Sequence, residues 1–183
     1  SIIKNLSEAV SALRGTTVQV EALTFEKPPL QSSKSVWLVP LLLLPGQHVR
    51  KDIPLIRKRM VEEGIMTTLL PFLGSWPGWV LTLKEFTNIR SSIGIPALIH
   101  HPLSSQISNR YVIFLKQILQ TPVVAWNNWE DFRISSEVRH SLIPLTLAPN
   151  RHTNTFCKEA DFSSLLEVDF VRNRLVDMLR HLP

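Results

Sequence analysis

The spacing of apolar residues along the chain predicts an alternation of helices and strands. Between Ile2 and Leu13 apolar side chains recur with the period of an amphipathic helix, and Gly15 is placed to end it. Pro54 would fall in the first turn of a second helix, where its missing N–H costs nothing. Helices are predicted over residues 1–13, 53–63, 76–88, 109–119 and 165–182.

Short apolar runs predict the strands between these helices. They cover residues 16–25, 36–44, 64–72, 94–102 and 121–126, with a further apolar run before His152. Residues 26–35 are rich in proline and serine and predict a loop, and the segment at 130–137 is also interpreted as a loop. Strands that alternate with helices predict an α/β fold in which a parallel sheet is flanked by helices.

Two segments of the chain match without a gap. "LVPLLLLPGQH" at residues 38–48 aligns with "LIPLTLAPNRH" at residues 142–152, an offset of 104 residues. The same offset aligns Ser1 with Ser105, Thr17 with Thr121, Val20 with Val124 and Glu26 with Glu130. One constant offset that joins a helix, two strands and a motif indicates two similar βα halves, residues 1–90 and residues 91–183.

The alignment also shows an absence. The second half opens with the strand in "ALIHHPLSS", and the counterpart of this strand would precede Ser1. We therefore expect the first half to lack its opening strand, either because it never had one or because the chain is shortened there. A sheet without this strand would keep an open edge, through which association with another chain is expected.

Composition indicates a globular protein with a sizeable core, because 44% of the residues are hydrophobic and 19% are charged. The longest apolar run is about half of the roughly 20 residues that span a membrane, so no membrane span is expected. A single cysteine, Cys157, cannot form an internal disulfide, which favours the cytoplasm or the plastid stroma.

The net charge of +5 favours an acidic ligand or partner, and much of the excess lies in "RKDIPLIRKRM" at residues 50–60. This cluster is either a solvated helix face or part of a site for a polyanionic small molecule. Nucleic acid is not expected, because recognition-helix, RNP-type and zinc-finger patterns are all absent from the sequence.

Three histidines, His48, His101 and His152, each follow an apolar run. Ligands of parallel sheets bind beyond the carboxyl ends of the strands, so all three would lie at the mouth of a cleft. His100 and His101 would point in opposite directions if the strand continued through them, so only one could face the cleft. Neutral imidazole binds divalent metals and accepts protons near neutral pH. Alternatively, these histidines only help to cap the following helices.

The residues around His48 resemble a known family. "VPLLLLPGQHVRKDIP" is similar to the motif of the small sirohydrochlorin chelatases of siroheme and cobalamin synthesis, in which a strand ends in a Pro-Gly-x-His turn followed by a basic residue and Asp-Ile-Pro. "LLPFLGSWPGWVLTLKEF" and "VEALTFEKPPL" resemble further strands of that family. "ALIHHPLSSQ" resembles its opening strand with His-Gly-Ser, where His101 is the better match. The resemblance covers most of residues 1–88 and, more faintly, residues 94–155.

The resemblance implies a chelatase-like fold of two halves with a tetrapyrrole cleft between them. The implied reaction inserts Fe²⁺, Co²⁺ or Ni²⁺, as a substrate, into sirohydrochlorin or a related polycarboxylated macrocycle, and no permanent organic cofactor is expected. The implied metal ligands are His48, His101 and His152, the implied catalytic residues are His48, His101 and Glu26, and the substrate carboxylates would bind Arg50, Lys51 and Arg57.

Departures from the family pattern leave alternatives open. The first half lacks the histidine of the opening strand, and the second half reads His-Pro-Leu and Asn-Arg-His where the family has His-Gly-Ser and Gly-x-His. The acidic residue that ends the second strand in the family stands here as Thr24, with Glu26 two positions further. One alternative is therefore a chelatase-like subunit that binds or assembles tetrapyrroles without catalysis. The other is an unrelated α/β protein that binds an anionic ligand.

Overall fold

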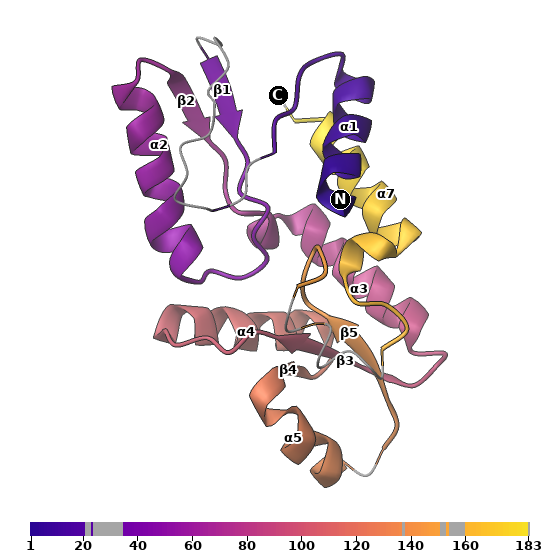
Figure 1. Ribbon diagram of the computed structural model, residues 1–183. Coiled ribbons are helices and arrows are strands. Elements are labelled where there is room, and N and C mark those ends of the chain that lie inside the picture. The colour runs from indigo at the N-terminus through magenta and orange to yellow at the C-terminus, as the bar shows by residue number, and fades with distance from the viewer. Residues whose placement is uncertain (21–22, 24–34, 137, 151–152, 154–159, 183) are drawn as a thin grey trace.

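The computed structural model describes residues 1–20, 23, 35–136, 138–150, 153 and 160–182 (Figure 1). Before residue 91 the chain forms α1 (Ile2–Arg14), β1 (Ser35–Leu38), α2 (Ile53–Glu62), β2 (Met66–Leu69) and α3 (Pro77–Arg90). After it the chain forms β3 (Ile95–His100), α4 (Gln106–Leu119), β4 (Val123–Ala125), α5 (Trp129–Ser136), β5 (His140–Pro144) and α7 (Asp169–Arg180). None of the described helices is long and apolar enough to cross a bilayer.

The strands form two parallel sheets, which confirms the predicted α/β class. β1 pairs with β2 in a register that runs from Ser35 opposite Met66 to Leu38 opposite Leu69. In the second sheet β3 lies between β4 and β5 and pairs in parallel with both. The two sheets lie in different parts of the molecule, with α3 between them in the ribbon (Figure 1).

Local sequence explains where several helices begin and end. Ser1 and Ser105 cap α1 and α4, each accepting a hydrogen bond from the backbone N–H three residues on. Gly15 ends α1 in the left-handed conformation at φ 63°, which glycine adopts without steric cost. Pro54 and Pro77 lie in the first turns of α2 and α3, as predicted.

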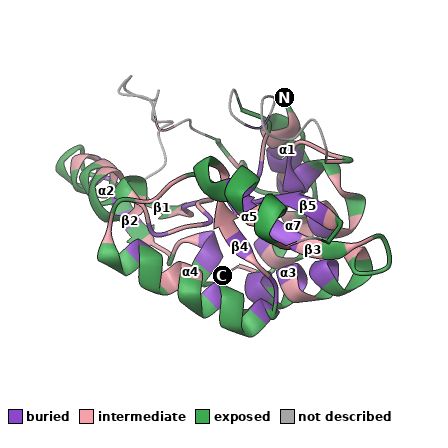
Figure 2. Ribbon diagram, turned by 90° about the horizontal axis from the view of Figure 1, so that it is seen from below, coloured by how far each residue is buried: buried purple, intermediate pink, exposed green. Residues whose placement is uncertain are grey.

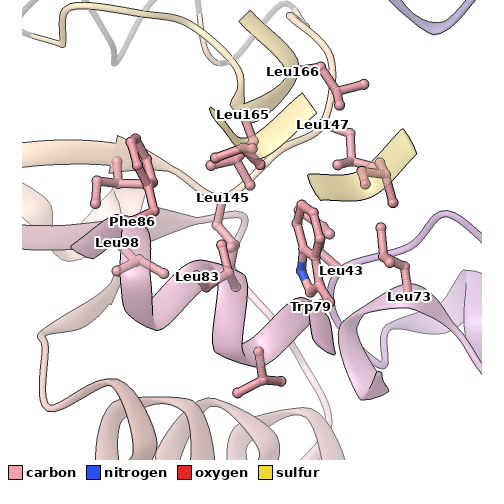
Figure 3. Close-up of a cluster of buried hydrophobic side chains, with 14 of the residues drawn as sticks. Leu43, Leu73, Trp79, Leu83, Phe86, Leu98, Leu145, Leu147, Leu165 and Leu166 are labelled. Atoms are coloured by element: carbon pink, nitrogen blue, oxygen red, sulfur yellow. The ribbon is translucent and has the colours of Figure 1, made fainter. Parts of the chain in front are cut away.

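One hydrophobic core joins both halves of the chain. Trp79 of α3 is fully buried and lies among leucines from both halves, including Leu43 and Leu147 (Figure 3). Helix α3 packs against α4 and α7, and α1 packs against α7. Buried residues gather around α3, α7 and β5, whereas α2 is largely exposed (Figure 2).

Two predicted strands are shorter than expected. Residues 17–20 form no strand, and most of the remaining predicted strand at 16–25 lies outside the described residues. The strand predicted over 36–44 ends at Leu38. Beyond it, the carbonyls of Pro40 and Leu42 accept hydrogen bonds from Leu73 and Gly74, so this segment pairs with a turn and not with a strand.

Two further predictions were wrong in the second half. Residues 130–137 were interpreted as a loop, but α5 occupies Trp129–Ser136, with two acidic residues in its first turn that favour a helix N-terminus. The helix predicted over 165–182 is divided. A 3₁₀ turn at Leu165–Glu167 comes first, and α7 begins after Val168, whose backbone is extended.

Candidate functional site

A cavity of about 670 Å³ lies at the carboxyl ends of β3 and β5. Its walls come from the segments that follow β1, β3 and β5, together with Trp126, Ser108 and Thr153. The lining residues are Leu41–Leu44, Gly46–His48, Arg50, Ile99–Ser105, Ser108, Trp126, Pro144–Asn150 and Thr153. Both segments of the matched motif, at 38–48 and at 142–152, therefore contribute to one cavity.

A second, smaller cavity of about 290 Å³ lies near the amino end of β5, and neither His48 nor His101 belongs to its lining. Its most buried basic group, Arg90, is already paired. The Nε of Arg90 donates to Ser141 Oγ at 2.9 Å, and its Nη2 lies 2.5 Å from Asp161 Oδ2. We therefore take the larger cavity as the candidate site.

His48 begins a short π-helical turn, His48–Asp52, immediately before α2. Turns of this type are rare and concentrate at functional sites. The π turn brings His48 Nδ1 to 2.5 Å from Asp52 Oδ2, and the side chains are 59% and 27% exposed. Asp52 was not among the predicted site residues, although an acidic residue four positions after a histidine at a helix start is a recognisable pattern.

The segment that carries His48 is anchored to α4. Ser108, which is 1% exposed, donates from Oγ to the carbonyl of Pro45 at 2.7 Å. The hydroxyl of Tyr111 donates to the carbonyl of Gly74. Burial raises the pKa of Tyr111 to about 12, so its hydroxyl stays protonated as a donor. These contacts fix the first-half wall of the cavity against the second half.

His100 and His101 both belong to the lining of the cavity, and the strand through both residues on which the expected alternation depended is not formed. The alternation of side chains stops because β3 ends at His100. His100 Nδ1 donates to the carbonyl of His101 at 2.7 Å, and His101 Nδ1 donates to that of Pro102 at 2.8 Å. The His101 ring meets Trp126 edge to face, with 4.4 Å between ring centroids.

The three described histidines of the cavity share one arrangement. Each places Nδ1 against an oxygen acceptor, so in the neutral ring Nε2 carries the lone pair. Burial lowers the pKa of His100, although its hydrogen bond to His101 acts in the opposite direction, so His100 is neutral at neutral pH. Such outer hydrogen bonds orient histidines that bind metals.

The remaining predicted residues are placed as follows. Arg50 lines the cavity, whereas Lys51 and Arg57 are exposed and lie outside its lining. Glu26 and His152 lie outside the described residues. Within the described part of the chain, no three His, Cys, Asp or Glu side chains come together as a metal site would require.

Comparison with solved structures identifies the fold of the chain. No protein-family model matches the chain, and no curated protein matches it. Two solved structures match nearly all of it. The sirohydrochlorin chelatase SirB from Bacillus subtilis subspecies spizizenii, in complex with cobalt, is 18% identical with a TM-score of 0.66, and the match covers 98% of this chain and 86% of that one. SirB from Bacillus subtilis with Fe³⁺ is 16% identical with a TM-score of 0.70, covering 97% and 87%. The chain therefore has the fold of these chelatases.

Proposed function

We propose that the protein is a tetrapyrrole metal chelatase that inserts Fe²⁺, Co²⁺ or Ni²⁺ into sirohydrochlorin or a related polycarboxylated macrocycle. The observation that carries the proposal is a single cavity whose lining includes His48, His100 and His101 and residues of both matched motif segments. The fold of solved structures that hold cobalt and Fe³⁺ supports the same activity.

The histidines provide the chemistry that insertion needs. When a divalent ion enters the macrocycle, two pyrrole N–H protons leave, so the site must first deliver a metal and then accept protons. In our proposal His48 and His101 bind the incoming ion and then accept protons, and His152 joins them as a ligand. Asp52 would stabilise the protonated ring of His48, because its carboxylate already accepts the Nδ1–H. Glu26 is proposed as a further proton acceptor.

The basic residues are proposed to hold the macrocycle. Arg50 lies in the cavity wall, where its guanidinium can pair with a carboxylate in bidentate fashion. Lys51 and Arg57 belong to the same exposed segment and would reach carboxylates that extend beyond the cavity. The apolar walls, including Leu41–Leu44 and Trp126, would contact the faces of the macrocycle.

A second candidate function is tetrapyrrole binding without catalysis. Two observations favour it: among the described residues no three metal ligands converge, and only Arg50 of the three expected basic residues lines the cavity. Under either function we propose a reducing compartment, the cytoplasm or the plastid stroma, on the single cysteine of the sequence.

The test follows the absorbance of sirohydrochlorin mixed with Co²⁺ in the presence and absence of the protein. The chelatase proposal requires acceleration over the uncatalysed reaction and its loss in His48→Ala. The matched control is His181→Ala, since His181 is an exposed histidine at the end of α7, outside the cavity lining.

Acceleration that survives His48→Ala would contradict the assignment of the site. Tight macrocycle binding without acceleration would favour the second candidate, and an absence of binding would refute both.

A further inference from the structure

Three arginines surround the smaller cavity of about 290 Å³ at the amino end of β5. Each comes from a different part of the chain: Arg90 is the last residue of α3, Arg133 belongs to α5, and Arg139 directly precedes β5. Helices α3 and α5 cover opposite faces of the second sheet (Figure 1). The cavity therefore lies where guanidinium groups from both faces of the sheet converge.

Arg90 is held in place through only part of its guanidinium group. Its side chain is 12% exposed, and its Cζ lies 5.5 Å from the ring centroid of Phe162. Nε donates to Ser141 and Nη2 to Asp161, whereas Nη1 has no acceptor among the described residues. A guanidinium carries five N–H donors, and a donor that is largely removed from water needs an acceptor. A ligand with acceptor oxygens would provide one.

Arg139 adds a second guanidinium on a fixed backbone. Its carbonyl accepts a hydrogen bond from the N–H of Ile95 at 3.2 Å, and a Cβ on Gly94 would lie 3.1 Å from the same oxygen. The start of β3 thus packs closely on the residue that carries this side chain. The side chain of Arg139 has no ion-pair partner among the described residues. Its charge is therefore available to a ligand in the cavity.

The charge and the walls of the cavity indicate what would bind there. Among the described groups that line it or pair with its arginines, three guanidinium groups face two carboxylates, those of Asp161 and Glu130. One net positive charge remains when His140 is neutral. Trp129 and Leu142, which are 5% and 4% exposed, provide an apolar wall. Small-molecule pockets begin at about 300 Å³, so the cavity suits a small molecule with one acidic group.

We propose that the smaller cavity is a second ligand site, which binds a small organic carboxylate with an apolar body. The carboxylate would bind the guanidinium groups of Arg90 and Arg139, since the planar fork of arginine matches the two carboxylate oxygens. The apolar body would contact the wall formed by Trp129. His140 and Pro144, at the two ends of β5, belong to different cavities, so this site is separate from the proposed chelatase site.

The test is an NMR titration of the protein with benzoate, followed at the backbone amides of Trp129, Arg139 and Leu142. We expect these amides to shift with one common saturation curve. Benzamide has the same shape without the charge and should bind about 10-fold more weakly or less, because it loses a charge-assisted hydrogen bond. Acetate keeps the charge without the ring and should also bind about 10-fold more weakly, because it buries less apolar surface.

Two variants test the assignment of the site. Arg139→Gln should weaken benzoate binding by about 10-fold. Arg110→Gln is the matched control, since Arg110 is an exposed arginine on α4 outside the lining of both cavities, and it should leave the affinity unchanged. The proposal would be overturned by a lack of saturable shifts at the three amides, or by equal weakening in both variants. Benzamide or acetate binding as tightly as benzoate would overturn it as well.

Discussion

Leu43 belongs to the cavity wall, and Gly74 packs closely against its backbone from outside the lining, so Gly74→Ala tests how tightly this wall is packed. A methyl group on Gly74 would lie 2.0 Å from the carbonyl oxygen of Leu43 and 2.6 Å from its carbonyl carbon. The obstacle is backbone, so no side-chain rotation relieves the clash, and the Leu43 segment must move by roughly 1 Å or more. Overpacking of this kind costs about 1–3 kcal/mol and sometimes more. We expect a loss near the upper end, about 3 kcal/mol.

Thermal and urea unfolding measure this effect. For a chain of this size, about 3 kcal/mol corresponds to a fall in Tm of roughly 6–12 °C. Gly46→Ala is the matched control, because Gly46 belongs to the same cavity-wall segment as Leu43 but an added methyl group on Gly46 meets nothing within 4 Å. We expect the control to change the free energy of unfolding by no more than about 0.5 kcal/mol.

The comparison of the two variants decides the prediction. A loss below about 1 kcal/mol for Gly74→Ala would refute the close packing of Leu43 on Gly74, since the lower bound for overpacking would not be reached. Equal losses in Gly74→Ala and Gly46→Ala would refute it as well, because the structure gives the two methyl groups opposite surroundings.

Three further predictions follow from polar groups around the cavity. Asp52→Asn removes the carboxylate that accepts the Nδ1 proton of His48 and should weaken Co²⁺ binding by about 10-fold or more, measured by calorimetric titration; unchanged affinity would contradict it. Ser108→Ala removes the hydroxyl that donates to the carbonyl of Pro45 and should lower the free energy of unfolding, measured in urea, by about 1–3 kcal/mol. An unchanged free energy of unfolding would contradict this prediction. Burial lowers the pKa of His100 from its ordinary value of 6.5. As the pH falls below 6.5, the unfolded chain therefore binds a proton at this residue before the folded chain does. The free energy of unfolding should accordingly decrease as the pH falls toward the folded-state pKa. His100→Gln should flatten that part of a pH series of urea midpoints, and an unchanged slope would exclude His100 as its source.

The helices were predictable because their determinants are local. The apolar period of α1, its Ser1 cap and its Gly15 terminator all lie within one short stretch of sequence. Helix α5 was missed because its apolar residues show no buried stripe: Trp129 is 5% exposed but Ile134 is 71% exposed. Its acidic first turn was the available signal.

The strands were less predictable because a strand exists only with a partner. Residues 17–20 have the β-branched composition of a strand, yet they form none, since the strand that would pair with them is not present among the described residues. By contrast β2 and β3 were predicted correctly, and both have partners in register.

The sequence located the cavity histidines but not what orients them. His48 and His101 follow apolar runs and line the cavity as expected. Their hydrogen bonds depend on local backbone geometry that was not predicted from the sequence: a π turn for His48 and a backbone turn after β3 for His101. Ser108 reaches Pro45 from 63 residues away, so only the assembled fold reveals that contact.

The proposed repeat is asymmetric, and hydrogen bonds show where the two halves diverge. Leu42 and Thr146 match under the constant offset, and their carbonyls accept from Gly74 and Leu165 respectively. Gly74 lies 32 residues after Leu42, but Leu165 lies only 19 residues after Thr146. Gly74 and Leu165 each belong to a 3₁₀ turn that precedes a long helix. In the order of elements, α7 in the second half therefore corresponds to α3 in the first.

The closing helix begins at Pro77 in the first half and at Asp169 in the second, so the interval between the motif and its closing helix is 12 residues shorter in the second half. In the first half this interval holds both α2 and β2, which together span Ile53–Leu69. Among the described strands β5 ends its sheet, whereas β1 pairs with β2. In both halves the motif segment is bonded to a 3₁₀ turn through backbone hydrogen bonds, and both motif segments line one cavity.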